Sequence, residues 1–260
     1  MMRGILAIAI HDLKRAWLDR ARLVAGLVQP LLYLFVLGAG IGAGSRMGGS
    51  DYRRFIFPGT MGLCLLFSAT FAAIAIVFDR QIGFFKAVLV APVPRPAIAM
   101  GKIAGGALQA LAQGVILLPF APLAGVSLGP LETVEMLGAM VIAAITFSTI
   151  GVSIACRFNS TTVFPIISNA VLLPMFFLSG ALYRLKDAPA WMRFAAHFDP
   201  VAYAVDLMRG SVLGTFFFPV PLSLGALALT ISLLTWAAVR VFERGEDDSA
   251  LGASRFNWRR

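Results

Sequence analysis

The sequence predicts an all-α membrane protein with six transmembrane helices, and two observations lead to that prediction. First, 59% of the 260 residues are hydrophobic and 13% are charged, with a mean hydropathy of +0.84, a composition that a water-soluble domain could not bury. Second, the charged residues separate six uncharged stretches, 23–45, 55–78, 103–131, 136–156, 158–183 and 210–239. Each can cross a hydrocarbon core of about 30 Å, which takes about 20 helical residues. A soluble enzyme, a disordered chain and a disulfide scaffold are excluded.

Helix is the expected state of every stretch. Backbone amides that face lipid must be satisfied within their own segment, and the alternating pattern of a membrane strand is absent from the sequence. We assign the spans to residues 23–45, 55–78, 103–125, 136–156, 163–183 and 217–239. Residues 1–260 then form a single transmembrane domain.

The distribution of Lys and Arg predicts the orientation of the chain. Six spans place both termini on one side, and that side collects fifteen of the 22 cations, against seven on the other. Because cytoplasmic loops carry the excess of Lys and Arg, both termini of this multi-pass protein are expected on the cytoplasmic side of the cell (inner) membrane. The net charge of +9 is spread between apolar runs, which favours membrane lipids over nucleic acid as a partner.

Residues 1–22 are predicted to form an amphipathic interfacial helix. On a helical wheel Leu6, Ile10, Leu13, Trp17 and Val24 share one face, and cations dominate the other. Such a helix lies on the cytoplasmic leaflet. It either anchors the first span or contacts a partner protein, and the sequence leaves both interpretations open.

The spans contain no Asp, Glu, Lys, Arg or His, so the sequence offers no proton relay or ion-coupling carboxylate. No phosphate-binding loop is present, because the single Gly-Lys pair, at 101–102, is followed by Ile rather than Ser or Thr. His11 and His197 are predicted on opposite sides of the membrane, and Cys64 and Cys156 inside spans, so we expect neither a metal site nor a disulfide. Energy for any pumping must therefore come from another protein.

Residues 79–102, between the second and third spans, are the strongest candidate for contact with that protein. The segment opens with the polar residues Asp79, Arg80 and Gln81. Prolines at 92, 94 and 96 are expected to interrupt any helix and to hold an extended turn before Gly101. A rigid connection of this kind can transmit a push, and the alternative is an ordinary loop with a short interfacial helix.

Four stretches carry a resemblance to a known family. They are Asp79-Arg80-Gln81-x-Gly83, followed by 89–95 and 101–102; Phe55-x-x-Pro58-Gly59; 164–180, with Pro174-x-Phe176-Phe177-Leu178-Ser179-Gly180; and Pro189-x-Trp191, followed by Asp199-Pro200-x-x-Tyr203-x-x-Asp206-x-x-Arg209. In this order they resemble the ABC-2 type permeases, the membrane subunits of the daunorubicin-resistance and nodulation-factor exporter kind. Two positions depart from the pattern: Gln81 stands where the family usually has Glu, and Asp199 where it usually has Asn. The first change removes a loop carboxylate, whereas Asp keeps the local turn geometry of Asn.

The resemblance implies the membrane half of an ABC exporter. Two copies of a six-helix subunit, or one copy and a similar partner, would face each other across a substrate path, and we expect the second subunit to be identical. Each would dock on a separate cytoplasmic ABC ATPase subunit, present in two copies, which binds ATP and Mg. This chain would bind no cofactor and would be a transport subunit, not an enzyme. The family's ATPase contact implies a coupling role for Asp79, Arg80, Gln81, Gly83, Phe84, Lys86, Pro92 and Arg95.

Residues 184–210 resemble the family's outer segment, which implies short re-entrant helices that dip into the outer leaflet. The candidate outer gate consists of Trp191, Phe198, Asp199, Pro200, Tyr203 and Arg209. Because Trp and Tyr gather at membrane interfaces in general, the alternative is an aromatic belt that only positions the last span.

Polar and aromatic residues inside the spans indicate the class of substrate. The candidate path residues are Gln29, Tyr33, Gln109, Gln113, Asn169, Phe176 and Phe177. Gln109 and Gln113 are four apart and share a helical face. Uncharged amides and aromatic rings suit an amphiphile, namely a drug-like molecule, a lipid or a lipid-linked glycan, as in multidrug or polysaccharide export. The alternative for each polar residue is a hydrogen bond between helices.

Two other functions stay open from the sequence. A membrane-embedded lipid-modifying enzyme would need His197, Asp199 and Asp206 as acid and base, and the sequence offers them neither a metal motif nor a nucleophile pairing. A passive channel would need more polar residues along its pore than the spans supply.

Overall fold

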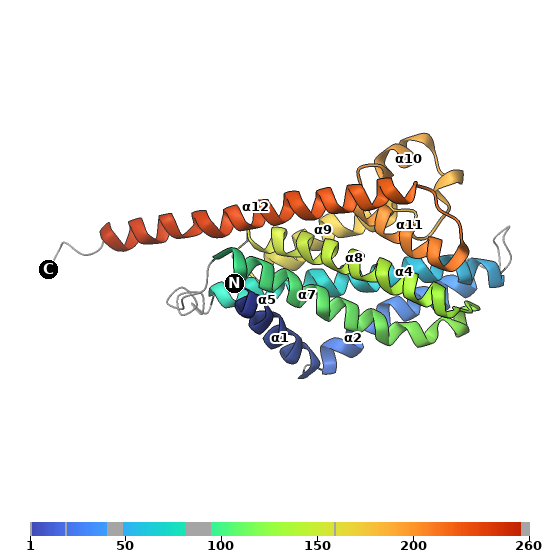
Figure 1. Cartoon of the computed structure of the whole chain (residues 1–260), viewed down its shortest axis with the longest axis horizontal. Helices are drawn as coiled ribbons and strands as arrows, with labels where there is room; N and C mark the ends of the chain where they lie inside the picture. The colour runs from blue at the N-terminus through green and yellow to red at the C-terminus, as the bar shows by residue number, and fades with distance from the viewer. Residues whose placement is uncertain (1, 19, 41–48, 82–94, 159, 256–260) are drawn as a thin grey trace.

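The structure is a computed structural model, and it describes residues 2–18, 20–40, 49–81, 95–158 and 160–255. All regular elements in these ranges are helices, as the sequence predicts. The main helices run along the long axis of the molecule, and the longest of them is α12 (Val220–Arg255) (Figure 1).

Four helices are long and apolar enough to cross a membrane. They cover Tyr52–Gln81, Pro96–Phe120, Pro130–Ala155 and Val220–Val241, and two shorter apolar helices cover Gly26–Gly40 and Val163–Leu178. At 1.5 Å per residue, the 16 residues of the last extend about 24 Å, which is less than a hydrocarbon core of about 30 Å. The chain is thus a multi-pass membrane protein with at least these four long apolar helices.

The centre of the bundle is formed by α4 (Gly49–Ala72), α7 (Arg95–Leu117) and α8 (Pro130–Ala155). Glycine brings their backbones close together, because a Cβ atom at Gly151 of α8 would lie 2.7 Å from Cα of Thr70 on α4. The rings of Phe57 and Phe147 are fully buried in this core. Small residues at the crossings provide the close packing that holds helices together in lipid.

The first of these long helices, Tyr52–Gln81, is interrupted near its end. α4 is followed by α5 (Ile74–Gln81) after a break at Ala73. The N–H of Ala73 donates to the carbonyl of Thr70 at 3.0 Å, and the N–H of Ile76 to that of Ala73 at 3.0 Å. Each of these hydrogen bonds joins residues three positions apart, as in a 3-10 helix, instead of four. They make one tight turn inside the helix, a feature that often marks a hinge.

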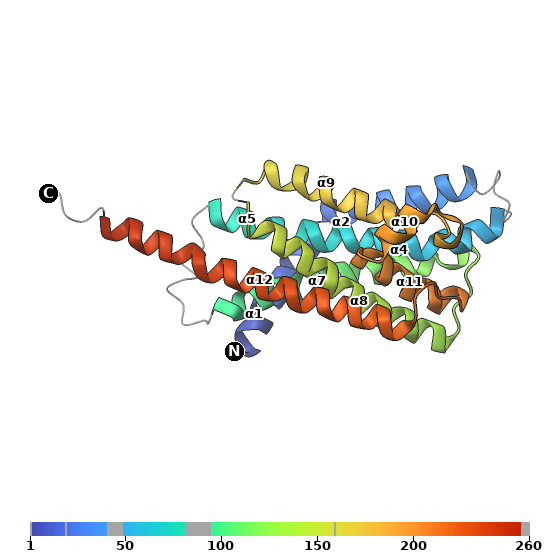
Figure 2. The same cartoon turned by 90° about the horizontal axis from the view of Figure 1, so that it is seen from above.

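The remaining helices surround this centre. α2 (Arg20–Leu32) continues into the π-helical turn η1 (Tyr33–Leu37) and packs on α4. α9 (Val163–Leu178) lies on α4 and α8, while α12 lies on α7 and α8. Figure 2 shows α9 and α12 along opposite edges of the bundle.

The two ends of the bundle differ. α10 (Ala190–Ala196) and α11 (Pro200–Leu213) lie at one end, called here the α11 end. The start of α1 (Met2–Leu18) and the ends of α5 and α12 lie at the other, called the termini end (Figure 1). Short 3-10 turns occupy Leu118–Phe120, Pro122–Ala124 and Leu185–Asp187.

The N-terminal helix packs on the start of α7. A Cβ atom at Gly101 would touch Ile8, and one at Gly105 would touch Asp12, so glycines on α7 receive this helix. Leu6 and Ile10 are 63% and 42% exposed, and the apolar face predicted from the helical wheel therefore points away from the bundle. The predicted helix 1–22 is also divided, because α1 ends at Leu18.

Two boundaries correct the sequence prediction. α7 begins at Arg95, so residues 95–101 are helical instead of an extended turn. Pro96 lies in the first turn, where a missing N–H breaks no helical hydrogen bond. The uncharged stretch 210–239 is divided as well, because α11 ends at Leu213 and Gly214 takes the left-handed φ of 66° that commonly ends helices.

Candidate functional site

Lys102 joins three helices at the termini end. Its Nζ donates to Oδ2 of Asp79 at 3.1 Å and lies 3.2 Å from Oδ2 of Asp12. The three side chains are 12%, 9% and 16% exposed, respectively. One cation shared by two shielded carboxylates thus links α7 to α5 and to α1. The sequence did not lead us to predict this arrangement. The signal that could have indicated it is the single lysine, Lys102, at the start of an apolar stretch.

The two residues after Asp79 contact the other side of the bundle. Arg80 Nη1 donates to the carbonyl of Cys156 at 2.8 Å, one of the carbonyls that a helix C-terminus leaves without a helical partner. Thr161 Oγ1 donates to Oε1 of Gln81 at 3.2 Å. Residues 79–81 therefore tie the end of α5 to α7, to the end of α8 and to the connection before α9, and through Lys102 to α1.

The other residues predicted for ATPase coupling are not placed. Gly83, Phe84, Lys86 and Pro92 lie outside the described residues. Arg95 is the first residue of α7, and its side chain is likewise outside the description.

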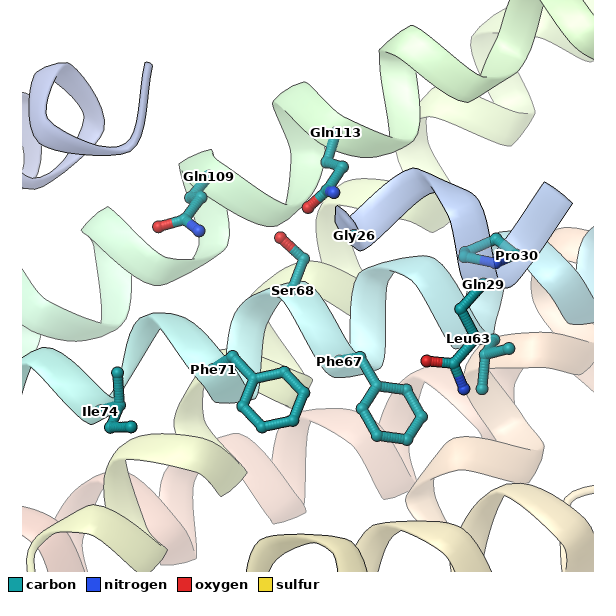
Figure 3. A pocket seen from close by; sticks show the side chains of 10 residues that line it. All are labelled: Gly26, Gln29, Pro30, Leu63, Phe67, Ser68, Phe71, Ile74, Gln109 and Gln113. Atoms are coloured by element: carbon teal, nitrogen blue, oxygen red, sulfur yellow. The ribbon is translucent and has the colours of Figure 1, made fainter. Parts of the chain in front are cut away.

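A cavity of about 390 Å³ lies between α2, α4 and α7 (Figure 3). This volume is within the range of small-molecule sites. Three of the seven predicted path residues line it, namely Gln29, Gln109 and Gln113. The complete lining is Gly26, Gln29, Pro30, Leu63, Phe67, Ser68, Phe71, Ile74, Gln109 and Gln113.

The lining combines amides, a hydroxyl and aromatic rings. Figure 3 shows Ser68 on the α4 side and the amides of Gln109 and Gln113 on the α7 side of the same space. The Ser68 hydroxyl is buried and has no hydrogen-bond partner among the described residues. Phe67 and Phe71 stack with ring centres 5.7 Å apart. The cavity therefore offers hydrogen bonds to a polar group and an apolar surface to the rest of a ligand.

Seven of the ten lining residues were not among the predicted path residues, and three of them show which signals the sequence held. Phe67 and Phe71 are four apart and therefore share the helical face beside Ser68, a signal that was present in the sequence. Gly26 keeps room for the cavity, because a Cβ atom there would collide with the amide of Gln113. The need for glycine at this position follows only from the approach of α2 to α7.

The predicted aromatic path residues form a separate group. The rings of Tyr33 and Phe176 meet edge to face with centres 6.4 Å apart, and Phe176 meets Phe177 at 5.8 Å. These contacts join η1 to α9. Asn169 is half-buried on α9 and does not line the cavity. The seven predicted path residues are thus divided between the cavity, an aromatic contact and α9.

Three of the predicted gate residues build the start of α11. Asp199 caps the helix, with Oδ1 accepting from the N–H of Val201 at 2.9 Å, and Pro200 occupies the first helical position. The Tyr203 hydroxyl donates to the carbonyl of His197 at 2.8 Å. Burial raises the pKa of Asp199 to about 7, and the hydrogen bond from Val201 opposes that shift.

The other three gate residues differ in exposure. Arg209 is buried, and its Nη2 donates to the carbonyl of Gly180 at 2.8 Å while its guanidinium lies 4.2 Å from the ring centre of Phe55. Trp191 and Phe198 are 64% and 75% exposed. The predicted gate residues thus divide into two exposed aromatic side chains and a set at α11 in which Asp199, Tyr203 and Arg209 are buried.

Comparison with known proteins identifies the family. The profile described as ABC-2 type transporter matches residues 3–213. The chain belongs to the ABC-2 type transporter family. The resemblance noted in the sequence is confirmed, and the matched range contains the Lys102 cluster, the cavity and all of α11.

Curated relatives agree with this membership. Nodulation protein J of Rhizobium leguminosarum bv. viciae is 30% identical over 217 residues, which cover 81% of this chain and 82% of that protein. Nodulation protein J of Rhizobium leguminosarum bv. trifolii is 29% identical over 230 residues, or 86% of each chain. The inner membrane transport permease YadH of Escherichia coli (strain K12) is 27% identical over 250 residues, covering 92% and 94%. The chain is thus similar to membrane transport permeases.

Proposed function

We propose that this ABC-2 family chain is the membrane subunit of an ABC exporter, which moves an amphiphile outward with energy from a separate ATPase. One observation carries the proposal. Residues 79–81 immediately precede the connection 82–94, and their side chains are tied to α7, to the end of α8 and, through Lys102, to α1. A force applied to that connection would therefore reach several helices of the bundle together.

The proposed topology has six spans and a cytoplasmic termini end in the inner membrane. The two shorter apolar helices, Gly26–Gly40 and Val163–Leu178, serve as the first and fifth spans, since a bilayer thins around a short helix at modest cost. Support for the orientation comes from the excess of Lys and Arg predicted on that side. Figure 1, in which both ends of the described chain lie at the termini end, supports an even number of spans.

The proposed partner at the termini end is a cytoplasmic ABC ATPase, in two copies, which binds ATP and Mg. Leu6 and Ile10 give α1 an exposed apolar surface beside the Lys102 cluster. An apolar patch next to a rigid joint suits a protein contact. A second, identical permease subunit would complete the path across the membrane.

The proposed substrate is an amphiphile such as a drug-like molecule, a lipid or a lipid-linked glycan. The cavity of about 390 Å³ supports this class, because its lining pairs the amides of Gln109 and Gln113 with the rings of Phe67 and Phe71. Apolar pockets with a few placed polar groups are typical of such ligands.

The experiment uses proteoliposomes that contain the full chain and its ATPase, with fluorescent lipids and dyes as transported probes. Asp79→Asn weakens the bond to Lys102, and we expect ATP-driven transport to fall about tenfold while the ATPase still binds. Asp187→Asn, which changes an exposed carboxylate at the α11 end, is the matched control and keeps transport within about twofold. Absence of ATP-dependent transport in the wild type, or full transport by Asp79→Asn, contradicts the proposal.

The contacts of the titratable residues argue against a membrane enzyme. Asp206 accepts hydrogen bonds from the N–H groups of Phe217 and Phe218 at 3.0 and 2.9 Å. His197 Nδ1 lies 2.8 Å from the carbonyl of Arg193. Oδ1 of Asp199 accepts from the N–H of Val201, while its Oδ2 has no partner among the described residues. The backbone contacts of Asp206 and His197 favour structural roles for these two residues over roles as acid or base.

A further inference from the structure

A second pocket, at the α11 end, collects cations. Its volume is about 240 Å³, and it shares no lining residue with the Gln-lined cavity. Three of its lining residues are cations and one is an acid, which leaves an excess of two positive charges. The lining is Phe55, Arg184, Leu185, Lys186, Asp206, Arg209, Leu213, Thr215, Phe216 and Phe217.

Arg209 is the buried charge of this pocket. Its side chain is 5% exposed, its Nη2 donates to the carbonyls of Gly180 and Ala181 at 2.8 and 3.4 Å, and its Nε has no hydrogen-bond partner among the described residues. Burial lowers the pKa of Arg209 to about 10, so the guanidinium stays charged at neutral pH. A buried cation with an unused donor is costly unless an anion accompanies it.

Asp206 interacts electrostatically with Arg209 and Lys186 but makes its hydrogen bonds to the backbone. Both of its carboxylate oxygens accept from the N–H of Phe217 at 3.0 Å, and one also accepts from the N–H of Phe218 at 2.9 Å. Within the described residues, no carboxylate lies within 4 Å of Arg209, Arg184 or Lys186. The carboxylate thus fixes the α11–α12 connection and leaves the cations without direct ionic partners.

The two outer cations converge on the same pocket. The guanidinium groups of Arg184 and Arg209 lie 6.0 and 4.2 Å from the ring centre of Phe55, so one ring has two like charges beside it. Arg184 and Lys186 are exposed and can turn toward a ligand. Two guanidinium groups and an ammonium around a small space match the oxygens of a phosphate group.

We propose that this pocket binds a phosphate group, held by Arg209 at its base and by Arg184 and Lys186 at its mouth. The group belongs either to a phospholipid headgroup or to a soluble phosphate-bearing molecule, since the same donors serve both. The site stands independently of the export function proposed above.

The test uses the purified full chain in two settings. In phosphatidylcholine nanodiscs, binding of inorganic phosphate is measured by the shift in melting temperature. In detergent, retention of phosphatidylglycerol is measured by native mass spectrometry. The variant Arg184→Gln with Lys186→Gln removes two exposed pocket cations, and Arg157→Gln with Arg193→Gln, also exposed, removes the same charge elsewhere.

We expect the pocket variant to weaken binding by about tenfold or more, because hydrogen bonds between charged groups are stronger than those between neutral ones, and the control to stay within about twofold. Retention of phosphatidylglycerol alone identifies the lipid headgroup, and a response to inorganic phosphate identifies a soluble source. The proposal is overturned if the wild type responds to neither probe. It is equally overturned if both double variants lose binding to the same extent.

Discussion

The two ends of this bundle treat charge in opposite ways. At the termini end, Lys102 is shared by Asp12 and Asp79, and all three are largely shielded from water. At the α11 end, the buried Arg209 has no carboxylate within 4 Å among the described residues, and Oδ2 of the buried Asp199 has no hydrogen-bond partner there. Paired charges build a joint between helices, whereas unpaired buried charges leave a group ready to bind an ion or a proton.

The largest effect is expected from breaking the joint. Lys102→Met leaves Asp12 and Asp79 as neighbouring shielded carboxylates without their cation, and removing one partner of such a cluster costs about 3 kcal/mol. The measurement is the free energy of unfolding in mixed micelles, followed by circular dichroism.

The matched control is Lys186→Met, which removes an exposed lysine at the other end and should change stability by less than about 0.5 kcal/mol. Adding Asp12→Asn and Asp79→Asn to Lys102→Met should restore part of the loss. Equal losses in the two lysine variants would refute the contrast between the two ends.

The helical class and the family follow from residue type and order, and the sequence was sufficient for both. Residues 79–81 were also identified from the sequence as a polar exit from the second span, yet their bonds to Cys156 and Thr161 were not. Those partners lie about 75 to 80 positions further along the chain. No local pattern reports which helix ends meet in space.

The cavity shows the same division between local and long-range information. The i, i+4 spacing of Gln109 and Gln113 predicted a shared face, and both residues line the cavity. Tyr33 and Phe176 were grouped with them because all lie in apolar stretches, but their rings meet each other and do not line this cavity. Composition selects residues that suit a path, whereas packing decides which of them share a space.

A smaller, pH-dependent effect is expected at the α11 end. Burial raises the pKa of Asp199 from its ordinary value of 3.8 to about 7, so the folded chain keeps a proton that the unfolded chain releases in this range. The free energy of unfolding should therefore fall as the pH rises from about 4 to about 7. Asp199→Asn keeps a capping oxygen and removes this dependence, which should make the variant more stable at pH 8 by on the order of 2 kcal/mol.

Asp187→Asn supplies the comparison for this titration, because Asp187 is exposed in the same outer segment. Its stability profile should follow that of the wild type within about 0.5 kcal/mol at every pH. A wild-type profile that stays flat between pH 4 and 7 would show that the carboxylate of Asp199 is not buried in the folded protein.

The smallest effect on stability is expected from Gln81→Glu, which introduces the carboxylate that the ABC-2 family usually carries here. Thr161 donates to Oε1 of Gln81 at 3.2 Å in an exposed position, and a carboxylate oxygen accepts the same bond, so the free energy of unfolding should change by less than about 0.5 kcal/mol. The added charge borders the connection 82–94, and we expect binding of the ATPase to tighten by about two- to fivefold in a pull-down titration. Thr161→Val removes the bond without adding charge and should leave that affinity unchanged. If neither variant alters it, residue 81 serves only the connection before α9, and the coupling depends on the paired Asp79.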